Sequence, residues 1–167
     1  IHRLGLRNIF VVDDNFIGNK KEAKALLHAL AEWQKERGYP LEMMTEVTLN
    51  IAQDDELLHL MREANFTTIF VGIESPRAAS LLETHKTQNL RESILDSVHR
   101  IQRAGIEVMA GMIVGFDSDD PSIFEEQFRF IQEARIPVSM TGMLNAIPKT
   151  PLYDRLKKAG RLIAESV

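Results

Sequence analysis

The 167-residue sequence contains no cysteine. This absence excludes disulfides, thiolate nucleophiles and any iron–sulfur cluster held by cysteines of this chain. Whatever chemistry these residues support therefore proceeds without thiolates of their own.

The sequence also lacks a long apolar run and an excess of positive charge. No segment approaches the roughly 18 apolar residues that a membrane-spanning helix needs, and the first residues, IHRLGLRN, lack the apolar core of a signal peptide. The formal net charge is -4, and the basic residues are scattered. We therefore expect no membrane span, a cytoplasmic location and no nucleic acid partner. The missing initiating Met predicts that the chain begins mid-protein or was processed.

The composition and the pattern of segments are typical of one α/β domain over residues 1–167. The sequence is 44% hydrophobic and 26% charged, and no Pro/Gly/Ser-rich linker divides it. Five apolar, strand-length segments alternate with amphipathic helical segments, which predicts five successive βα units with parallel strands. The predicted strands are Asn8–Asp13, Met44–Ile51, Thr68–Ser75, Val108–Asp117 and Pro137–Ala146.

Capping residues predict where the intervening helices begin. The expected starts are Asn19, Asp54, Asn89, Asp120 with Pro121, and Thr150 with Pro151. In the helix after Asp120, a stripe of Phe124, Phe128 and Ile131 is expected to pack on the sheet.

Several predicted strands carry polar residues or glycine on one face. An open doubly wound sheet has helices over two apolar faces, and a filled barrel has branched residues inside. A partial TIM-like β/α barrel with an interior cavity fits better, because polar and glycine positions can line a space for a ligand. The residues expected to face this interior are Glu46, Thr48, Asn50, Gly72, Glu74, Gly111, Ile113, Gly115, Ser139, Thr141 and Asn145.

Ligands of parallel α/β folds bind at the carboxyl ends of strands. A carboxylate on a buried face, such as Glu74, is costly unless it is paired or solvated, so we expect a functional role there. Asp13 and Asp14 are equally consistent with turn chemistry. Gly111 and Gly115 are consistent with a flat ligand or with the close approach of another segment.

Four segments in this order, VVDDNF, TLNIAQDDELLHLMREANFTTIFVGIES, AGMIVGFD and LNAIPKTPLYDRL, resemble the C-terminal part of the barrel of radical S-adenosylmethionine enzymes. The closest likeness is to the branch with an upstream cobalamin-binding domain, which includes enzymes similar to those that methylate hopanoid lipids. The resemblance implies S-adenosylmethionine, a [4Fe-4S] cluster with ligands outside this chain, cobalamin held upstream, and a small-molecule or lipid substrate. It implies methyl transfer or related oxidoreductase-type radical chemistry, and a fragment that is inactive alone.

The same resemblance assigns individual roles. Gly111, Ile113 and Gly115 occupy the strand next to adenine, and Asp117 follows it. The resemblance places Glu74 and Ser75 near the ribose or methionine moiety, and Asp13 or Asp14 near the methionine amine. Four of the residues that the strand pattern turns inward are expected to face the substrate: Glu46, Asn50, Thr141 and Asn145. The family has glutamate where this sequence has Ser118, between Asp117 and Asp119.

Two other interpretations stay open. The VVDD segment and Lys149 also resemble the acidic pair and late lysine of a receiver domain, which would use Asp13 and Asp14 in phosphoryl transfer, although Glu74 stands where the phosphate-accepting aspartate is required. A non-catalytic interaction domain is the third interpretation. In a barrel that lacks its leading strand, the Asn8–Asp13 edge is left unpaired, which predicts self-association.

Overall fold

The computed structural model describes residues 4–83 and 93–162. At its centre is a five-stranded sheet in the order β1-β2-β3-β4-β5, in which every neighbouring pair is parallel. The strands are β1 (Asn8–Val11), β2 (Glu42–Val47), β3 (Phe66–Glu74), β4 (Glu107–Val114) and β5 (Val138–Met143). Strand order follows chain order, so each crossover joins two adjacent strands.

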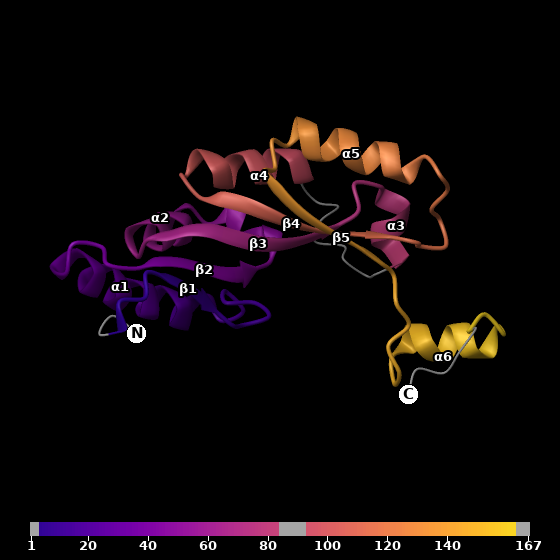
Figure 1. Cartoon of the computed structure of the whole chain (residues 1–167), viewed down its shortest axis with the longest axis horizontal. Helices are drawn as coiled ribbons and strands as arrows, with labels where there is room; N and C mark the ends of the chain where they lie inside the picture. The colour runs from indigo at the N-terminus through magenta and orange to yellow at the C-terminus, as the bar shows by residue number, and fades with distance from the viewer. Residues whose placement is uncertain (1–3, 84–92, 163–167) are drawn as a thin grey trace.

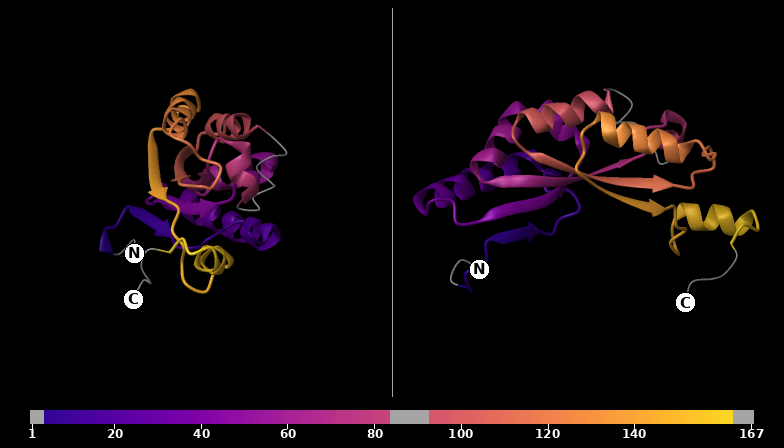
Figure 2. Two further views of the ribbon diagram at one scale, coloured as in Figure 1. Left: turned by 90° about the vertical axis from the view of Figure 1, so that its right-hand side faces the viewer. Right: turned by 45° about the horizontal axis from the view of Figure 1, so that its top comes forward.

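The main helices cover one side of this sheet. The helical segments are α1 (Lys20–Glu36), the 3-10 helix η2 (Leu49–Gln53), α2 (Asp55–Glu63), α3 (Ala78–Glu83), α4 (Ile94–Arg103), α5 (Ile123–Glu133) and α6 (Pro151–Lys158). α1, α2, α4 and α5 lie on the outer side of the curved sheet, and α6 extends beyond the carboxyl end of β5 (Figure 1). Seen along the strands, the sheet is an open arc with β1 and β5 at its two ends (Figure 2, left).

Burial alternates along the central strands. In β3, Ile69, Val71 and Ile73 are fully buried against the helices, whereas Phe70 and Gly72 on the opposite side are half-buried. β4 alternates in the same way. Burying one large apolar side chain contributes roughly 1.5–3 kcal/mol, so the helix-covered side holds the fold together. The inner side is left partly open, which confirms the predicted partial β/α barrel.

The strand order excludes the receiver alternative. A receiver-type doubly wound sheet has the order 2-1-3-4-5 with helices on both faces. Here β1 lies at an edge beside β2 alone among the described residues, and the main helices share one side. The phosphoryl-transfer hypothesis for Asp13 and Asp14 is therefore wrong.

Several predicted boundaries are also wrong. β1, β4 and β5 end at Val11, Val114 and Met143, before the predicted Asp13, Asp117 and Ala146. β2 ends at Val47 instead of continuing to Ile51, because Thr48 begins η2 and its Oγ1 donates to Asn50 Oδ1 at 2.7 Å. α5 begins at Ile123 instead of directly after Asp120, because the Asp120 carboxylate accepts the Ser122 N–H at 2.8 Å in a preceding turn. The start predicted at Asn89 lies outside the described residues.

The late start of α5 changes the residues that it buries. Ile123 and Gln127 face the sheet, and Gln127 Nε2 donates to the Ile113 carbonyl at 2.7 Å. Phe124 and Phe128 are 65% and 60% exposed. The predicted inward stripe is therefore wrong at both phenylalanines, while Ile131 does pack against the core.

One edge of β1 has no partner in the part of the chain that the structure describes. Phe10 and Val12 at this edge are 45% and 84% exposed. We expect the isolated 167-residue chain to self-associate, because an apolar open edge pairs readily with another strand. Sizing chromatography over a concentration series should show a rising apparent mass, and a Phe10→Lys variant should reduce it. A wild-type monomer at every concentration would contradict the expectation.

Candidate functional site

The carboxyl ends of β1 and β2 are joined by side-chain amides and hydroxyls. Asn15 Oδ1 accepts the Thr48 N–H at 3.2 Å, and the Phe16 N–H donates to the Glu46 carbonyl at 3.0 Å. Asn50 is half-buried beside Thr48. The structure thus brings Asn50 to the rim formed by the carboxyl ends of β1 and β2, although Asn50 belongs to η2 and not to a strand.

Asp13 and Asp14 lie exposed on the same rim. Asp13 Oδ1 accepts the Asn15 N–H at 2.9 Å, which is a local turn of the kind that aspartate often forms. Turn chemistry therefore accounts for one oxygen of Asp13. It does not account for Asp14.

The end of β3 is irregular. The register with β4 shifts between Gly72 and Glu74, so that Glu74 lies opposite Met112. Glu74 also has a φ of 69°, a left-handed conformation that is uncommon for glutamate. Such bulges and strained residues concentrate next to functional sites. Ser75, in contrast, is fully buried, and its Oγ accepts the Arg77 N–H at 3.1 Å, so it shapes the turn and does not face the open side.

Gly111 in β4 and Gly115 directly after β4 are glycines for different structural reasons. A Cβ on Gly111 would lie 2.8 Å from Cζ of Phe70, so this glycine makes room for the ring. Gly111 itself is half-buried, so its backbone keeps some exposed surface beside the ring. Gly115 has a φ of 99°, and the nearest atoms to a Cβ there belong to Leu144 at 3.8 Å. The space beside Gly115 is consequently less crowded than the space beside Gly111.

The turn after β4 is fixed by a residue that the sequence did not single out for function. Asp119 Oδ2 accepts the N–H groups of Gly115 and Phe116 at 2.8 and 3.0 Å. The other oxygen, Oδ1, accepts from Ser80 Oγ at 2.8 Å. The acidic DSDDPS segment is typical of a turn, but its sequence does not reveal which aspartate binds the backbone.

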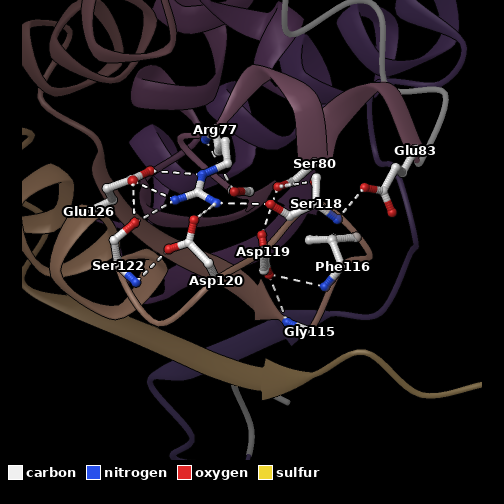
Figure 3. Close-up of polar contacts among 11 residues, drawn as sticks. Arg77, Ser80, Glu83, Gly115, Phe116, Ser118, Asp119, Asp120, Ser122 and Glu126 are labelled. Carbon is white, nitrogen blue, oxygen red and sulfur yellow. Dashed lines mark hydrogen bonds and ion pairs between the residues drawn. The ribbon is translucent and has the colours of Figure 1, made fainter.

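Arg77 was also missed, and it connects two turns (Figure 3). Its guanidinium donates to Glu126, to Ser122 Oγ at 2.8 Å and to the Ser118 carbonyl at 3.0 Å. Nη1 also lies 3.5 Å from the Asp120 carboxylate. The Arg77 guanidinium holds the pKa of Glu126 below its usual value. No spacing in the sequence links Arg77 to partners more than 40 residues away.

Asp117 is bound by cations. Its carboxylate pairs with Arg155 of α6 and with Arg161, the latter at 2.7 Å. These arginines, Arg155 foremost, lower the pKa of Asp117. The Asp117 N–H donates to Glu83 at 3.0 Å. A cofactor that contacted the Asp117 carboxylate would have to displace two guanidinium groups.

The predicted orientation of β5 is wrong. Thr141 pairs with Met112 and therefore lies on the outer side, whereas Gly142 pairs with Ile113 on the inner side. Ser139 shares the outer side with Thr141 because side chains alternate. All six residues of β5 are exposed, so polar residues on its outer side carry no desolvation cost. Asn145 lies exposed beyond the end of the strand.

The family profile described as the Radical SAM superfamily matches residues 1–131. The chain belongs to the radical SAM superfamily. It is 49% identical over 160 residues to the hopanoid C-2 methylase of Rhodopseudomonas palustris (strain TIE-1), covering 95% of this chain and 30% of that protein. It is 24% identical to the bacteriochlorophyllide d C-12(1)-methyltransferase of Chlorobaculum tepidum, covering 93% of this chain and 33% of that protein.

Solved structures agree on the fold of this radical SAM chain. The methyltransferase TsrM from Kitasatospora setae, with cobalamin and a [4Fe-4S] cluster bound, superposes with a TM-score of 0.78 at 16% identity, covering 98% of this chain and 33% of that one. Methylornithine synthase superposes with a TM-score of 0.60 at 15% identity, covering 89% and 42%. The chain spans about a third of the length of the curated relatives it matches.

The radical SAM chain offers no metal site of its own in residues 4–83 and 93–162. No group of three or more His, Asp or Glu side chains there could hold a metal ion, and the sequence has no cysteine for a cluster. The chain therefore does not fit an iron–sulfur cluster by itself. Nor does any helix within these ranges have the length and apolarity needed to cross a membrane.

Proposed function

We propose that this chain forms the cofactor- and substrate-facing wall of a radical SAM methyltransferase, within a longer protein. The observation that carries the proposal is the 49% identity to a hopanoid C-2 methylase over nearly the whole chain. The open inner side of the sheet and the irregular ends of β3 and β4 support it, because ligands of β/α barrels bind at strand carboxyl ends.

The proposed site residues divide by chemistry. Ile113, which is half-buried, and Gly115, which is exposed, offer an apolar strip that suits an adenine ring. Glu74 beside it offers a carboxylate, which accepts hydrogen bonds from ribose hydroxyls or pairs with an ammonium group. Asp13 and Asp14 supply the same chemistry at the end of β1. Glu46 and Asn50, both half-buried, are the proposed substrate-facing groups.

The remaining cofactors are proposed to lie on other parts of the same protein. Cluster cysteines must come from elsewhere, since this chain has none. Cobalamin is proposed by analogy to TsrM, whose structure contains it. When bound, S-adenosylmethionine supplies the methyl and adenosyl groups of the reaction, while this wall orients the cofactor and limits the access of water. The substrate is proposed to be a small molecule or a lipid, and the location is proposed to be cytoplasmic.

The proposal predicts a difference between the isolated chain and the full-length protein. After anaerobic reconstitution with iron and sulfide, the full-length protein should show a broad charge-transfer band and bind S-adenosylmethionine. The 167-residue chain should stay colourless, because cluster ligation needs thiolates. A full-length protein that neither binds iron nor S-adenosylmethionine would overturn the proposed function.

A further inference from the structure

The Arg77 network joins the two turns that carry the proposed cofactor residues. We propose that Arg77 and Asp119 are positioning residues for the S-adenosylmethionine site: Arg77 sets the spacing of the turns after β3 and β4, and Asp119 fixes the peptide planes at Gly115. This inference rests on the proposed function. It concerns residues that act through others and need not touch the cofactor.

Arg77 reaches from one turn to the other. Its own backbone is held in the β3–α3 turn, where its N–H donates to Ser75 Oγ at 3.1 Å. Its guanidinium bonds the Ser118 carbonyl at 3.0 Å and Glu126 at 3.1 Å on the β4–α5 side. The Arg77 side chain is only 16% exposed, although Glu126 is 43% exposed, so these bonds are partly shielded from water. Glu74 and Gly115, which precede the two turns, are thereby held at one spacing.

The geometry of this contact is specific to arginine. Guanidinium presents five N–H donors in a planar fork, and here Nε, Nη1 and Nη2 all have partners. Lysine would keep the charge but offers a point ammonium that cannot reproduce the fork. Removing the charge altogether would also leave Asp120 and Glu126 near each other without the cation between them.

Asp119 determines where the backbone after β4 points. Gly115 and Phe116 donate their N–H groups to the same oxygen, Oδ2, at 2.8 and 3.0 Å. In a trans peptide the carbonyl lies opposite the N–H, and the structure has no cis peptide bonds in the described ranges. The Val114 carbonyl accordingly points away from Asp119 and accepts the Leu144 N–H at 2.8 Å. The Gly115 carbonyl is directed away from Asp119 in the same manner, because the Phe116 N–H of that peptide donates to Asp119.

The test uses the full-length, cluster-reconstituted protein with three variants at the network. Arg77→Lys and Asp119→Ala should each raise the Kd for S-adenosylmethionine about tenfold to a hundredfold, as expected for a small misplacement of a binding group. Asp119→Asn should retain affinity, because its side-chain oxygen can still accept both N–H groups. The matched control is Arg129→Lys, which alters a 75% exposed ion pair with Glu125 on α5 and should change nothing.

A second measurement separates positioning from general stability. Hydrogen exchange at the amides of Gly115 and Phe116 should speed up in Asp119→Ala and stay slow in Asp119→Asn, while thermal melts of the Arg77→Lys and Asp119→Asn proteins stay close to wild type. Unchanged affinity in both Arg77→Lys and Asp119→Ala would overturn this inference alone. The inference would also be overturned if every variant that loses affinity for S-adenosylmethionine also has a lowered melting temperature. A wild-type protein that does not bind S-adenosylmethionine would overturn the proposed function and, with it, this inference.

Discussion

Replacing Gly111 with valine should destabilise the protein by about 1–3 kcal/mol, the usual cost of overpacking. A Cβ at this position would lie 2.8 Å from Cζ and 3.2 Å from Cε1 of Phe70. The ring must therefore leave its position, or the two strands must separate. Chemical denaturation of the variant and the wild type, followed by far-UV circular dichroism, measures the difference in free energy of unfolding.

The neighbouring strand provides a matched control. Gly142 lies on the same side of the sheet, opposite Ile113, and nothing lies within 4 Å of a Cβ built there. Gly142→Val should leave stability unchanged or raise it slightly, because valine favours strands. Phe70→Leu should rescue Gly111→Val, giving a non-additive double mutant. An unchanged midpoint for Gly111→Val would show that the ring moves freely and that glycine is not needed for packing.

Replacing Gly115 with leucine should abolish S-adenosylmethionine binding in the full-length protein. If adenine lies against this position, a large side chain occupies the space of the ring. The φ of 99° adds a second effect, since any residue with a Cβ is strained there by roughly 1–3 kcal/mol. Loss of binding by one variant alone would not distinguish bulk from strain.

The Gly115→Ala and Gly115→Leu variants together make that distinction. Both carry the backbone strain, so both should melt at a similarly lowered temperature. Only leucine adds bulk, so its affinity should be lost while alanine keeps measurable binding in a cofactor titration. Equal affinity for the two variants would mean that the end of β4 is not the adenine wall. Valine is less suitable, because β-branched residues are strained further at positive φ.

Much of the fold could be predicted because hydrophobic alternation reports directly on strand faces. Ile69, Val71 and Ile73 share one face, opposite Gly72 and Glu74, and the structure buries that face of β3. On β5 the alternation led to the wrong choice of inner face. All residues of this strand are exposed, so its polar face need not be the inner one. Periodicity gives two faces, and packing decides which of them is covered.

The candidate site was predictable only in part. Gly111 and Gly115 were recognised as a pair, but whether a glycine accommodates a neighbouring ring or a left-handed turn depends on atoms distant in sequence, such as those of Phe70. Arg77 and Asp119 were not predicted for a related reason. Arg77 bonds a carbonyl 41 residues away, and sequence spacing does not reveal which aspartate of the turn accepts the Gly115 N–H. Short-range capping was easier: Asn19 and Thr150 do begin α1 and α6.

The sequential strand order has a consequence for how the chain acquires its structure. Each strand pairs with the one immediately before it, so no strand must wait for a distant segment in order to be inserted between two others. Each pairing closes a single βα unit, such as Asn8 with Glu42 across α1, and contacts of lower sequence separation form faster than contacts between distant strands. βα units can therefore be added one at a time as the polypeptide leaves the ribosome, each new strand using the exposed edge of the last as its template.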